Sequence, residues 1–249
     1  MKALIDADTI VFTVAITNQE DFSWDEDAED DSYFDFKAAT IALHKGISDV
    51  LEATKCTEYE FHMTGSNNFR HDLGSYKANR KDKVLPVGIQ PLRAYAMEHL
   101  GGIMAEGMEA DDVVVHLKNT NPEDYVVCAI DKDVLYQSVG KHYNYNKNEW
   151  VTVSQEEATQ YMYFQVLTGD VTDGYKGCTR VGKVGATKIL DGSKNYELDV
   201  AKAYKKAGHD YGYMLSQYRM ASMNQFNGSE IVLHELQITE KEYNGLKTP

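Results

Sequence analysis

The stretch YVVCAIDKD, residues Tyr125–Asp133, decides the fold class of this chain. An uninterrupted apolar run comes first, and two acids, Asp131 and Asp133, follow it directly. Apolar runs of this length are typical of strands that are buried on both faces of a parallel sheet. The stretch therefore predicts a central strand whose carboxyl end carries carboxylates.

Strands and helices alternate along the chain on both sides of this stretch. The apolar runs predict further strands at Lys2–Asp6, Tyr59–Met63 and Ile103–Ala105, and a hairpin formed by residues 142–147 and 150–153. Helical periodicity predicts helices at Ala38–Leu51, Ile89–Leu100, Ala110–Lys118, Gln155–Leu167 and Ala186–Leu190. This alternation favours an α/β fold with a mainly parallel central sheet and helices on both faces, followed by a helical C-terminal region.

Length and composition favour a globular protein. A chain of 249 residues with 43% apolar residues can bury a large core, as one domain or as a main domain with an appendage. We expect a division into residues 1–168 and 169–249. The three cysteines show no metal-type spacing, and no stretch reaches the roughly 18 apolar residues of a membrane span. We expect a soluble, cytoplasmic, monomeric protein with no membrane partner.

The charge of the chain is unevenly distributed. Its formal net charge is −14, but residues 20–35 alone contain nine acids and no Lys or Arg. By contrast, residues 64–93 and 174–194 each carry an excess of four positive charges. Basic stretches of this kind are what a phosphate backbone requires, so the overall negative charge does not exclude a nucleic-acid partner.

Acidic clusters follow predicted strands or begin predicted helices. Since the carboxyl ends of parallel strands meet at one edge of a sheet, we expect these clusters to converge there. Bare carboxylates in such a group would repel one another, and oxygen-only ligands favour Mg²⁺ or Mn²⁺ over Zn²⁺. Two such ions would support in-line cleavage of a phosphodiester. The candidate ligands are Asp6, Glu109, Asp111, Asp112, Asp131, Asp133, Asp170 and Asp173.

A basic stretch, GSYKANRKDK at residues 74–83, is the second component. Lys77 and Arg80 are three residues apart, which on a helix places both cations on one face, where they could oppose charge that develops on the scissile phosphate. We therefore predict that these two residues are catalytic. Tyr76 could stack on a base. The other predicted DNA contacts in this region are Arg70, Lys81 and Lys83.

A glycine-rich stretch, GCTRVGKVG at residues 177–185, is the third component. Gly182 and Gly185 would permit a tight turn that exposes backbone N–H groups at the start of a helix, where a phosphate and a bridging K⁺ ion could bind. Lys183 and Lys188 would add positive charge. Taken alone, a glycine-rich turn is a weak signal, for which an ordinary loop is the default interpretation.

Taken in order, these motifs resemble the 5′→3′ exonuclease and flap endonuclease family, particularly its bacteriophage members. The resemblance is carried by Asp6, by YKANR at residues 76–80, by EADD at residues 109–112, by IDKD at residues 130–133 and by the GDVTDG stretch with its hairpin. It implies a PIN-like nuclease fold, a helix-hairpin-helix motif and a helical arch at about residues 77–100.

The resemblance also implies a function and a division of the ligands. Asp6, Glu109, Asp111 and Asp112 would hold one metal ion, and the remaining acids the other. The substrate would be DNA with a 5′ end or flap, or an RNA–DNA hybrid, in phage DNA replication or host DNA degradation. The chain departs from many relatives at Thr64, where they carry an additional acid, so one ion would bind more weakly.

The sequence also allows two other functions. Asp6-Ala7-Asp8-Thr9 after a strand also resembles the nucleophile motif of haloacid-dehalogenase phosphatases, although that family has no use for EADD or for the glycine hairpin. A non-catalytic protein that binds DNA structures through the hairpin is the third possibility, but it would have no reason to keep mutually repelling acids. The acidic residues 20–35 fit either a solvated loop, which we favour, or a phosphate mimic.

Overall fold

The computed structural model describes residues 1–22, 31–74, 76–80 and 83–247, except 224, 225, 228, 229, 232 and 234. Contacts divide the chain into two compact units. The sheet unit consists of Met1–Ser66 with Lys83–Thr152, and the helical unit consists of Asn67–Asp82 with Val153–Pro249. The division differs from the boundary expected at residue 168, because Val166 and Leu167 at the end of the preceding helix are buried in the core of the helical unit.

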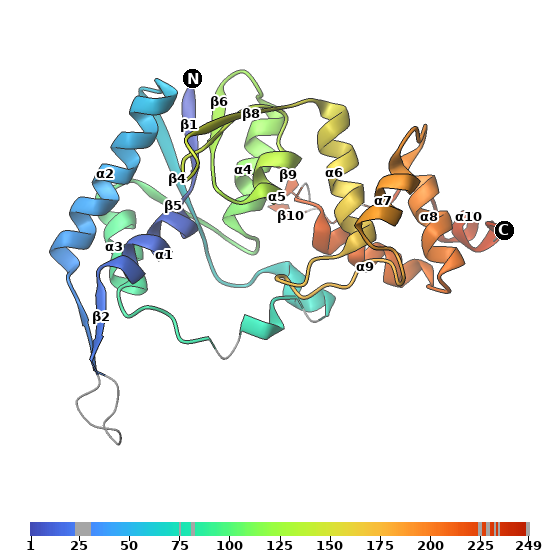
Figure 1. The fold of residues 1–249 in the computed structure, drawn as a ribbon, viewed down its shortest axis with the longest axis horizontal. Helices are drawn as coiled ribbons and strands as arrows, with labels where there is room; N and C mark the ends of the chain where they lie inside the picture. The colour runs from blue at the N-terminus through green and yellow to red at the C-terminus, as the bar shows by residue number, and fades with distance from the viewer. Residues whose placement is uncertain are drawn as a thin grey trace. The chain divides into compact units, whose positions relative to one another are not determined.

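A six-stranded sheet, with strand order β5-β4-β1-β6-β7-β8, forms the centre of the sheet unit (Figure 1). β1 lies between β4 and β6 and is parallel to both, β5 is parallel to β4, and β7 is parallel to β6. The mainly parallel sheet confirms the predicted fold class. The strands are β1 (Lys2–Asp6), β4 (Glu58–Thr64), β5 (Gly102–Ala105), β6 (Tyr125–Cys128), β7 (Gly140–Asn144) and β8 (Glu149–Val153).

Helices cover both faces of this sheet. α1 (Ala7–Thr17), α2 (Phe36–Thr54) and α3 (Ile89–His99) share one core with alternate residues of the strands, such as Ile5 and Phe61. Successive side chains of a strand point to opposite faces, so the buried Leu4 faces the other side. There α4 (Ala110–Thr120) packs on β1, β4 and β6, and α5 (Lys132–Gln137) packs on α4.

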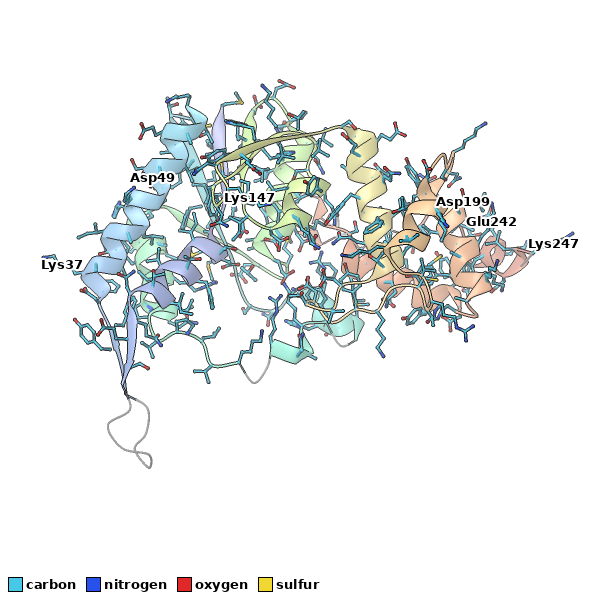
Figure 2. The ribbon with its side chains drawn as sticks, in the orientation of Figure 1. Lys37, Asp49, Lys147, Asp199, Glu242 and Lys247 are labelled. Carbon is cyan, nitrogen blue, oxygen red and sulfur yellow. The ribbon has the colours of Figure 1, made fainter. Side chains whose placement is uncertain are left out.

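α2 shows how the sequence pattern produces this arrangement. Its buried residues recur at helical spacing: Ala39, Leu43, Ile47, Val50 and Thr54. Lys37, which precedes these residues, and Asp49, which lies between Ile47 and Val50, are exposed and project from the helix (Figure 2). The helix begins after Asp35, whose carboxylate accepts a hydrogen bond of 2.9 Å from the backbone N–H of Ala38. The helix therefore has a capped start and one apolar face towards the sheet.

The helical unit has its own core, which includes Leu167, Leu190, Val200, Tyr204 and Tyr243. Figure 1 shows its helices in yellow, orange and red. Their bounds are α6 (Gln155–Thr168), α7 (Lys183–Leu190), α8 (Tyr196–Lys206), α9 (Tyr211–Ala221) and α10 (Glu240–Gly245), with the 3₁₀ helices η1 (Phe69–Leu73) and η2 (Ala78–Arg80) and the short strands β9 (Phe226–Asn227) and β10 (Glu230–Ile231). The predicted helical C-terminal region is therefore present.

Two segments differ from the sequence-based expectations. Residues 77–100 do not form a continuous helical arch: η2 and α3 are helical, but residues 83–88 between them are not. Pro86 and Gly88 account for the break, because proline lacks a backbone donor and glycine disfavours helix. Within the acidic stretch, β2 (Gln19–Phe22) and β3 (Asp31–Phe34) pair as antiparallel strands. The solvated loop was predicted for residues 20–35; its two ends form these strands, and residues 23–30 lie outside the described residues.

None of the helices in the described ranges is long and apolar enough to cross a membrane.

Candidate active site

Asp6 lies at the carboxyl end of the central strand and is the most constrained acid of the sheet unit. Only 3% of its surface is exposed, and its Oδ1 atom is buried without a hydrogen-bond partner among the described residues. Burial, together with the negative charges of Asp8, Asp131 and Glu109, raises the pKa of the Asp6 carboxyl to about 7. Within the sheet unit, Asp6 therefore lies within electrostatic reach of Asp8, Glu109 and Asp131.

The EADD motif forms the first turn of α4. The backbone N–H of Glu109 donates to Oδ2 of Asp112 (3.1 Å), and the next N–H, of Ala110, donates to Oγ1 of Thr64 at the end of β4 (3.0 Å). These bonds fix the helix start against the strand end. Glu109 and Asp112 are buried, whereas Asp111 is partly exposed. Thr64, which stands where an additional acid was expected, thus anchors the acidic helix start.

The third cluster follows β6, which ends at Cys128 rather than at the predicted Ile130. Asp131 is exposed and occupies the position before α5, where its Oδ1 atom accepts a hydrogen bond of 2.8 Å from the N–H of Asp133. Asp133 is buried. Since Asp131 contributes to the raised pKa of Asp6, the two strand ends bring these acids into electrostatic contact.

The sequence analysis did not predict two further residues at this edge of the sheet, Tyr145 and Arg93. Tyr145 directly follows β7, and burial raises its pKa, with the charge of Asp6 and, more weakly, of Asp111 adding to the effect. The strand-end rule that found Asp131 would also have found Tyr145. Arg93 of α3 pairs with Asp8 (2.8 Å) and donates to the backbone carbonyl of Thr64. Asp8 lies in α1, Thr64 in β4 and Arg93 in α3. Because these elements are separate in sequence, no local pattern predicts the contacts among the three residues.

The residues of this edge suit a hard divalent cation. Their donors are carboxylate oxygens, the ligands that Mg²⁺ and Mn²⁺ prefer, and a bound cation would satisfy the buried Oδ1 of Asp6 and reduce the repulsion among the acids. As placed, no three His, Cys, Asp or Glu side chains in the described part of the chain form a ready-made metal cluster. Asp112 and Asp131 accept bonds at helix starts, so their carboxylates would reorient to bind a cation.

In the helical unit, a tight loop holds Asp170 and Asp173. Asp170 and Tyr175 exchange backbone hydrogen bonds of 2.9 and 3.1 Å, which closes the loop. Gly169 and Gly177 flank it, both with a φ of 66°, and a Cβ atom on either would lie within 2.6 Å of the backbone opposite. Both glycines are therefore required here. Oδ1 of Asp170 also accepts from the N–H groups of Thr172 and Asp173.

Lys77 and Arg80 meet at one carboxylate. Nη2 of Arg80 lies 2.9 Å from Oδ1 of Asp173, and Nζ of Lys77 lies 3.8 Å from the same oxygen. The backbone N–H of Lys77 also donates to the carbonyl of Asp173 (2.7 Å). Lys77 has a φ of +50° and precedes η2, so the two cations do not share a helix face as predicted. They are brought together by Asp173 instead.

Comparisons with known proteins agree with these features. No family model matches the chain. It is 27% identical to the exonuclease of Escherichia phage T7 over 82% of the chain and 75% of that protein. It is 29% identical to the exodeoxyribonuclease of Enterobacteria phage T3 over 86% of the chain and 74% of that protein. Its fold resembles the T5 D15 protein co-crystallised with metal ions, with a TM-score of 0.61, 11% identity and 90% of each chain covered.

These similarities support the resemblance to the phage-type 5′→3′ exonuclease and flap endonuclease family. Two of the predicted DNA contacts in residues 64–93 are buried instead of exposed. Arg70 is 2% exposed, and its guanidinium donates to the carbonyls of Met220 (3.2 Å) and Ser222 (2.8 Å). Tyr76 is 4% exposed, and its hydroxyl donates to Oδ2 of Asp173 (3.2 Å).

These contacts correct two predictions. Arg70 secures the end of α9 rather than a phosphate, and the ring of Tyr76 packs in the core of the helical unit, where it cannot stack on a base. Residue type and position in a basic stretch predict a DNA contact, but they do not report burial. Lys83 is exposed, as a DNA contact requires. Lys81 lies outside the described residues.

The tight turn of the glycine-rich stretch is not made by the two glycines named in the prediction. Gly182, with φ −88°, precedes α7, and Gly185 lies inside that helix, so neither adopts a left-handed conformation. Gly177, with φ 66°, and Arg180, with φ 67°, are the left-handed residues of residues 177–185. A Cβ atom on Gly182 would meet nothing within 4 Å, so this glycine leaves the helix start open to a bound group. Lys183 and Lys188 are exposed.

Proposed function

We propose that this protein is a divalent-metal-dependent nuclease that hydrolyses DNA phosphodiesters from or near a 5′ end. The observation that carries the proposal is the buried carboxylate of Asp6, whose pKa is raised by burial and by acids from three other positions. A protein has no structural reason to bury such a group without a cation. The phage T7 and T3 relatives are an exonuclease and an exodeoxyribonuclease, and a T5 flap endonuclease of similar fold was crystallised with DNA and metal ions.

Carboxylate side chains would hold the metal ions. Asp6, Glu109, Asp111 and Asp112 are the proposed ligands of one ion, and Asp131, Asp133, Asp170 and Asp173 are those that the family resemblance assigns to a second. Bound Mg²⁺ or Mn²⁺ ions supply an activated water and stabilise the leaving oxygen of a phosphodiester. Because Thr64 provides a hydroxyl where relatives carry an acid, we expect one ion to bind more weakly.

The protein's own cations would act on the phosphate. Lys77 and Arg80 are held by Asp173, which fixes their positions before DNA arrives. A preorganised pair of this kind opposes the negative charge that builds up in the transition state at little cost in reorganisation. The exposed start of α7 and Lys183 would hold the phosphate backbone of the duplex, where a K⁺ ion could bridge.

The structure disfavours the phosphatase alternative. If Asp8 were to act as a general acid or base, its carboxylate would have to be free to donate and accept a proton. Here Oδ1 of Asp8 pairs with Arg93 (2.8 Å) and Oδ2 accepts a hydrogen bond from the N–H of Thr64 (2.9 Å). Asp8 therefore has a structural role. A protein that only binds DNA would not require the buried charge of Asp6.

The direct test uses duplex DNA labelled at the 5′ end of one strand and, in a matched substrate, at its 3′ end. We expect labelled nucleotides to be released first from the 5′-labelled strand, in Mg²⁺ or Mn²⁺ and not in EDTA. Early release of the 3′ label would contradict the polarity. The same assay on an RNA–DNA hybrid measures the preference for DNA. A role in phage DNA replication or host DNA degradation, as a cytoplasmic monomer, is proposed from the family resemblance alone.

A further inference from the structure

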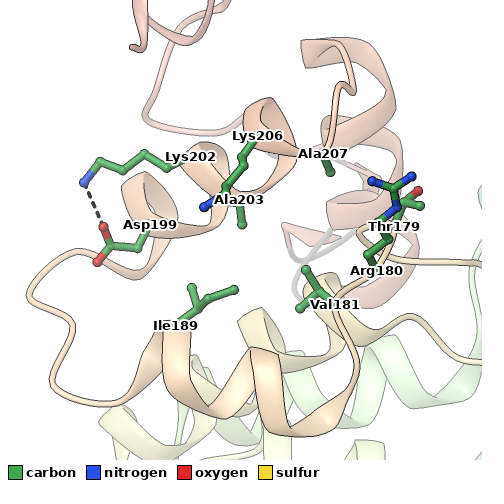
Figure 3. A pocket seen from close by; sticks show the side chains of 9 residues that line it. All are labelled: Thr179, Arg180, Val181, Ile189, Asp199, Lys202, Ala203, Lys206 and Ala207. Carbon is green, nitrogen blue, oxygen red and sulfur yellow. Dashed lines mark hydrogen bonds and ion pairs between the residues drawn. The ribbon is translucent and has the colours of Figure 1, made fainter. Parts of the chain in front are cut away.

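The helical unit contains a pocket that neither Lys77 nor Arg80 lines. It has a volume of about 560 Å³ and is formed between the hairpin loop with α7 and the C-terminal half of α8 (Figure 3). None of the predicted metal ligands lines it. Its size falls within the range of about 300–1,000 Å³ that is typical of sites for small molecules.

Two opposed apolar walls form the inside of this pocket. Val181 and Ile189 come from the hairpin and α7, and Ala203 and Ala207 come from α8 and its end (Figure 3). All four are partly exposed, so the protein's own side chains do not fill the space. The small alanine side chains leave a flat wall opposite the two branched residues. Such a slot fits a planar apolar group.

The rim of the pocket is cationic. Lys202 and Lys206 are one helical turn apart on α8, and Arg180 lies on the hairpin loop. Lys202 is paired with Asp199 (2.9 Å), whereas Arg180 and Lys206 form no ion pair with any other residue that the structure describes. The lining therefore carries three positive charges and one negative charge. Each of these two cations could contact an anion without breaking an existing ion pair.

We propose that this pocket binds a nucleoside phosphate, with the base between the apolar walls and the phosphate at Lys206 and Arg180. A contact with a phosphate backbone alone would need the cations but not the apolar slot, and an apolar ligand would not need the cations. The combination selects a planar group joined to a phosphate. The ligand is either a free mononucleotide or one nucleotide of a single strand, since both have this chemistry.

The experiment measures binding by isothermal titration in EDTA, where metal-dependent hydrolysis does not occur. The probes are deoxyadenosine 5′-monophosphate, deoxyadenosine, inorganic phosphate and a 5′-phosphorylated oligothymidylate. We expect the monophosphate to bind about tenfold or more tightly than deoxyadenosine or phosphate alone, since each lacks one half of the contacts. Tighter binding of the oligothymidylate than of the monophosphate would identify a strand as the source of the nucleotide.

Two variants test the site. Lys206→Ala removes a charged contact and should weaken binding about tenfold, and Ala203→Leu fills the slot and should weaken it at least as much. Lys206 is exposed and Ala203 is partly exposed, so both variants should fold, which thermal unfolding checks. Lys241→Ala is the matched control, because Lys241 is an exposed lysine of α10 that does not line the pocket.

Three results would overturn the assignment. The first is that neither the monophosphate nor the oligothymidylate binds. The second is that folded Lys206→Ala and Ala203→Leu both bind as the unmodified protein does. The third is that Lys241→Ala weakens binding as strongly as Lys206→Ala, which would indicate a general charge effect. Because no hydrolysis is measured, failure here leaves the proposed nuclease function untouched, and failure of that function leaves this site untouched.

Discussion

The guanidinium of Arg80 lies 2.9 Å from Oδ1 of Asp173, and the ammonium group of Lys77 lies 3.8 Å from the same oxygen. An acid assigned to metal binding therefore also positions the two cations assigned to the phosphate. The loop that carries Asp173 is in turn fixed by Gly169 and Gly177, at positions where a Cβ atom would collide with the opposite backbone. The roles of these residues should consequently be coupled.

The cationic pair and the hairpin lysine should affect different steps. We expect Lys77→Ala and Arg80→Ala to lower the single-turnover cleavage rate about 100-fold with little change in duplex affinity, because they act on charge in the transition state. Lys183→Ala should chiefly weaken duplex binding, by less than about tenfold. If all three variants weaken binding equally and leave the cleavage rate unchanged, Lys77 and Arg80 are ordinary phosphate contacts.

Arg70 should affect stability rather than DNA binding. Replacing it by Met leaves the carbonyls of Met220 and Ser222 without their donors, and we expect a loss of about 2–4 kcal/mol in the free energy of unfolding, measured with urea. Arg180→Met, at an exposed arginine, should cost less than about 0.5 kcal/mol. If Arg70→Met leaves the free energy of unfolding unchanged but weakens DNA binding, Arg70 is a DNA contact after all.

Asp6 should reduce stability when no metal is present. Its buried carboxylate is repelled by Asp8, Asp131 and Glu109, so Asp6→Asn should raise the Tm in EDTA by about 2–4 °C while abolishing cleavage. A site built for function commonly carries such a cost. Asp124→Asn, at an exposed acid outside the cluster, should change neither quantity. A lower Tm for Asp6→Asn in EDTA would show that the carboxylate is structurally required.

His142 should make the protein sensitive to mild acid. Burial lowers its pKa to about 4, as does the nearby positive charge of Lys118, while the hydrogen bond from Nε2 to the carbonyl of Ser138 acts in the opposite direction. The unfolded chain binds a proton near pH 6.5, whereas the folded chain does not until about pH 4. The contribution of His142 to the free energy of unfolding is therefore fully present above pH 6.5, and it is lost as the pH falls towards 4.

The variant His142→Gln isolates this effect. Glutamine can keep a donor to Ser138 but does not titrate, so the free energy of unfolding should fall less between pH 6.5 and 4 than in the unmodified protein. Urea unfolding at several pH values measures the difference. Parallel curves for the two proteins would mean that His142 is not the source of the acid sensitivity.

The central strands could be predicted from the sequence because a strand that is buried on both faces requires a continuous run of apolar residues. The apolar runs of β1 and β6 are uninterrupted, and the acids Asp6 and Asp131 lie at or just after their carboxyl ends. The same rule placed Asp6 and Asp131 at one edge. α1 was not predicted, because its residues are apolar on nearly every side and show no helical period, with Phe12 and Ile16 exposed.

The misassigned site residues share one physical cause. Arg70 and Tyr76 lie in a basic stretch, but their side chains are buried by α9 and by the Asp173 loop, which are distant in sequence. The pairing of Lys77 with Arg80 was predicted from helix spacing, whereas Asp173 brings them together. Contacts across more than 90 residues leave no local pattern, so periodicity and spacing cannot report them.

The most direct test of the nuclease function compares Asp133→Asn and Asp170→Asn with the unmodified protein on a 5′-labelled duplex. The measured quantities are the single-turnover rate of nucleotide release in Mg²⁺ and the duplex affinity in EDTA. We predict that both variants lose release by about 100-fold or more while they bind the duplex as well as, or better than, the unmodified protein, because the lost charge is a metal ligand that repels phosphate. Full release by either variant, or by the unmodified protein in EDTA, would contradict a metal-dependent mechanism at these carboxylates.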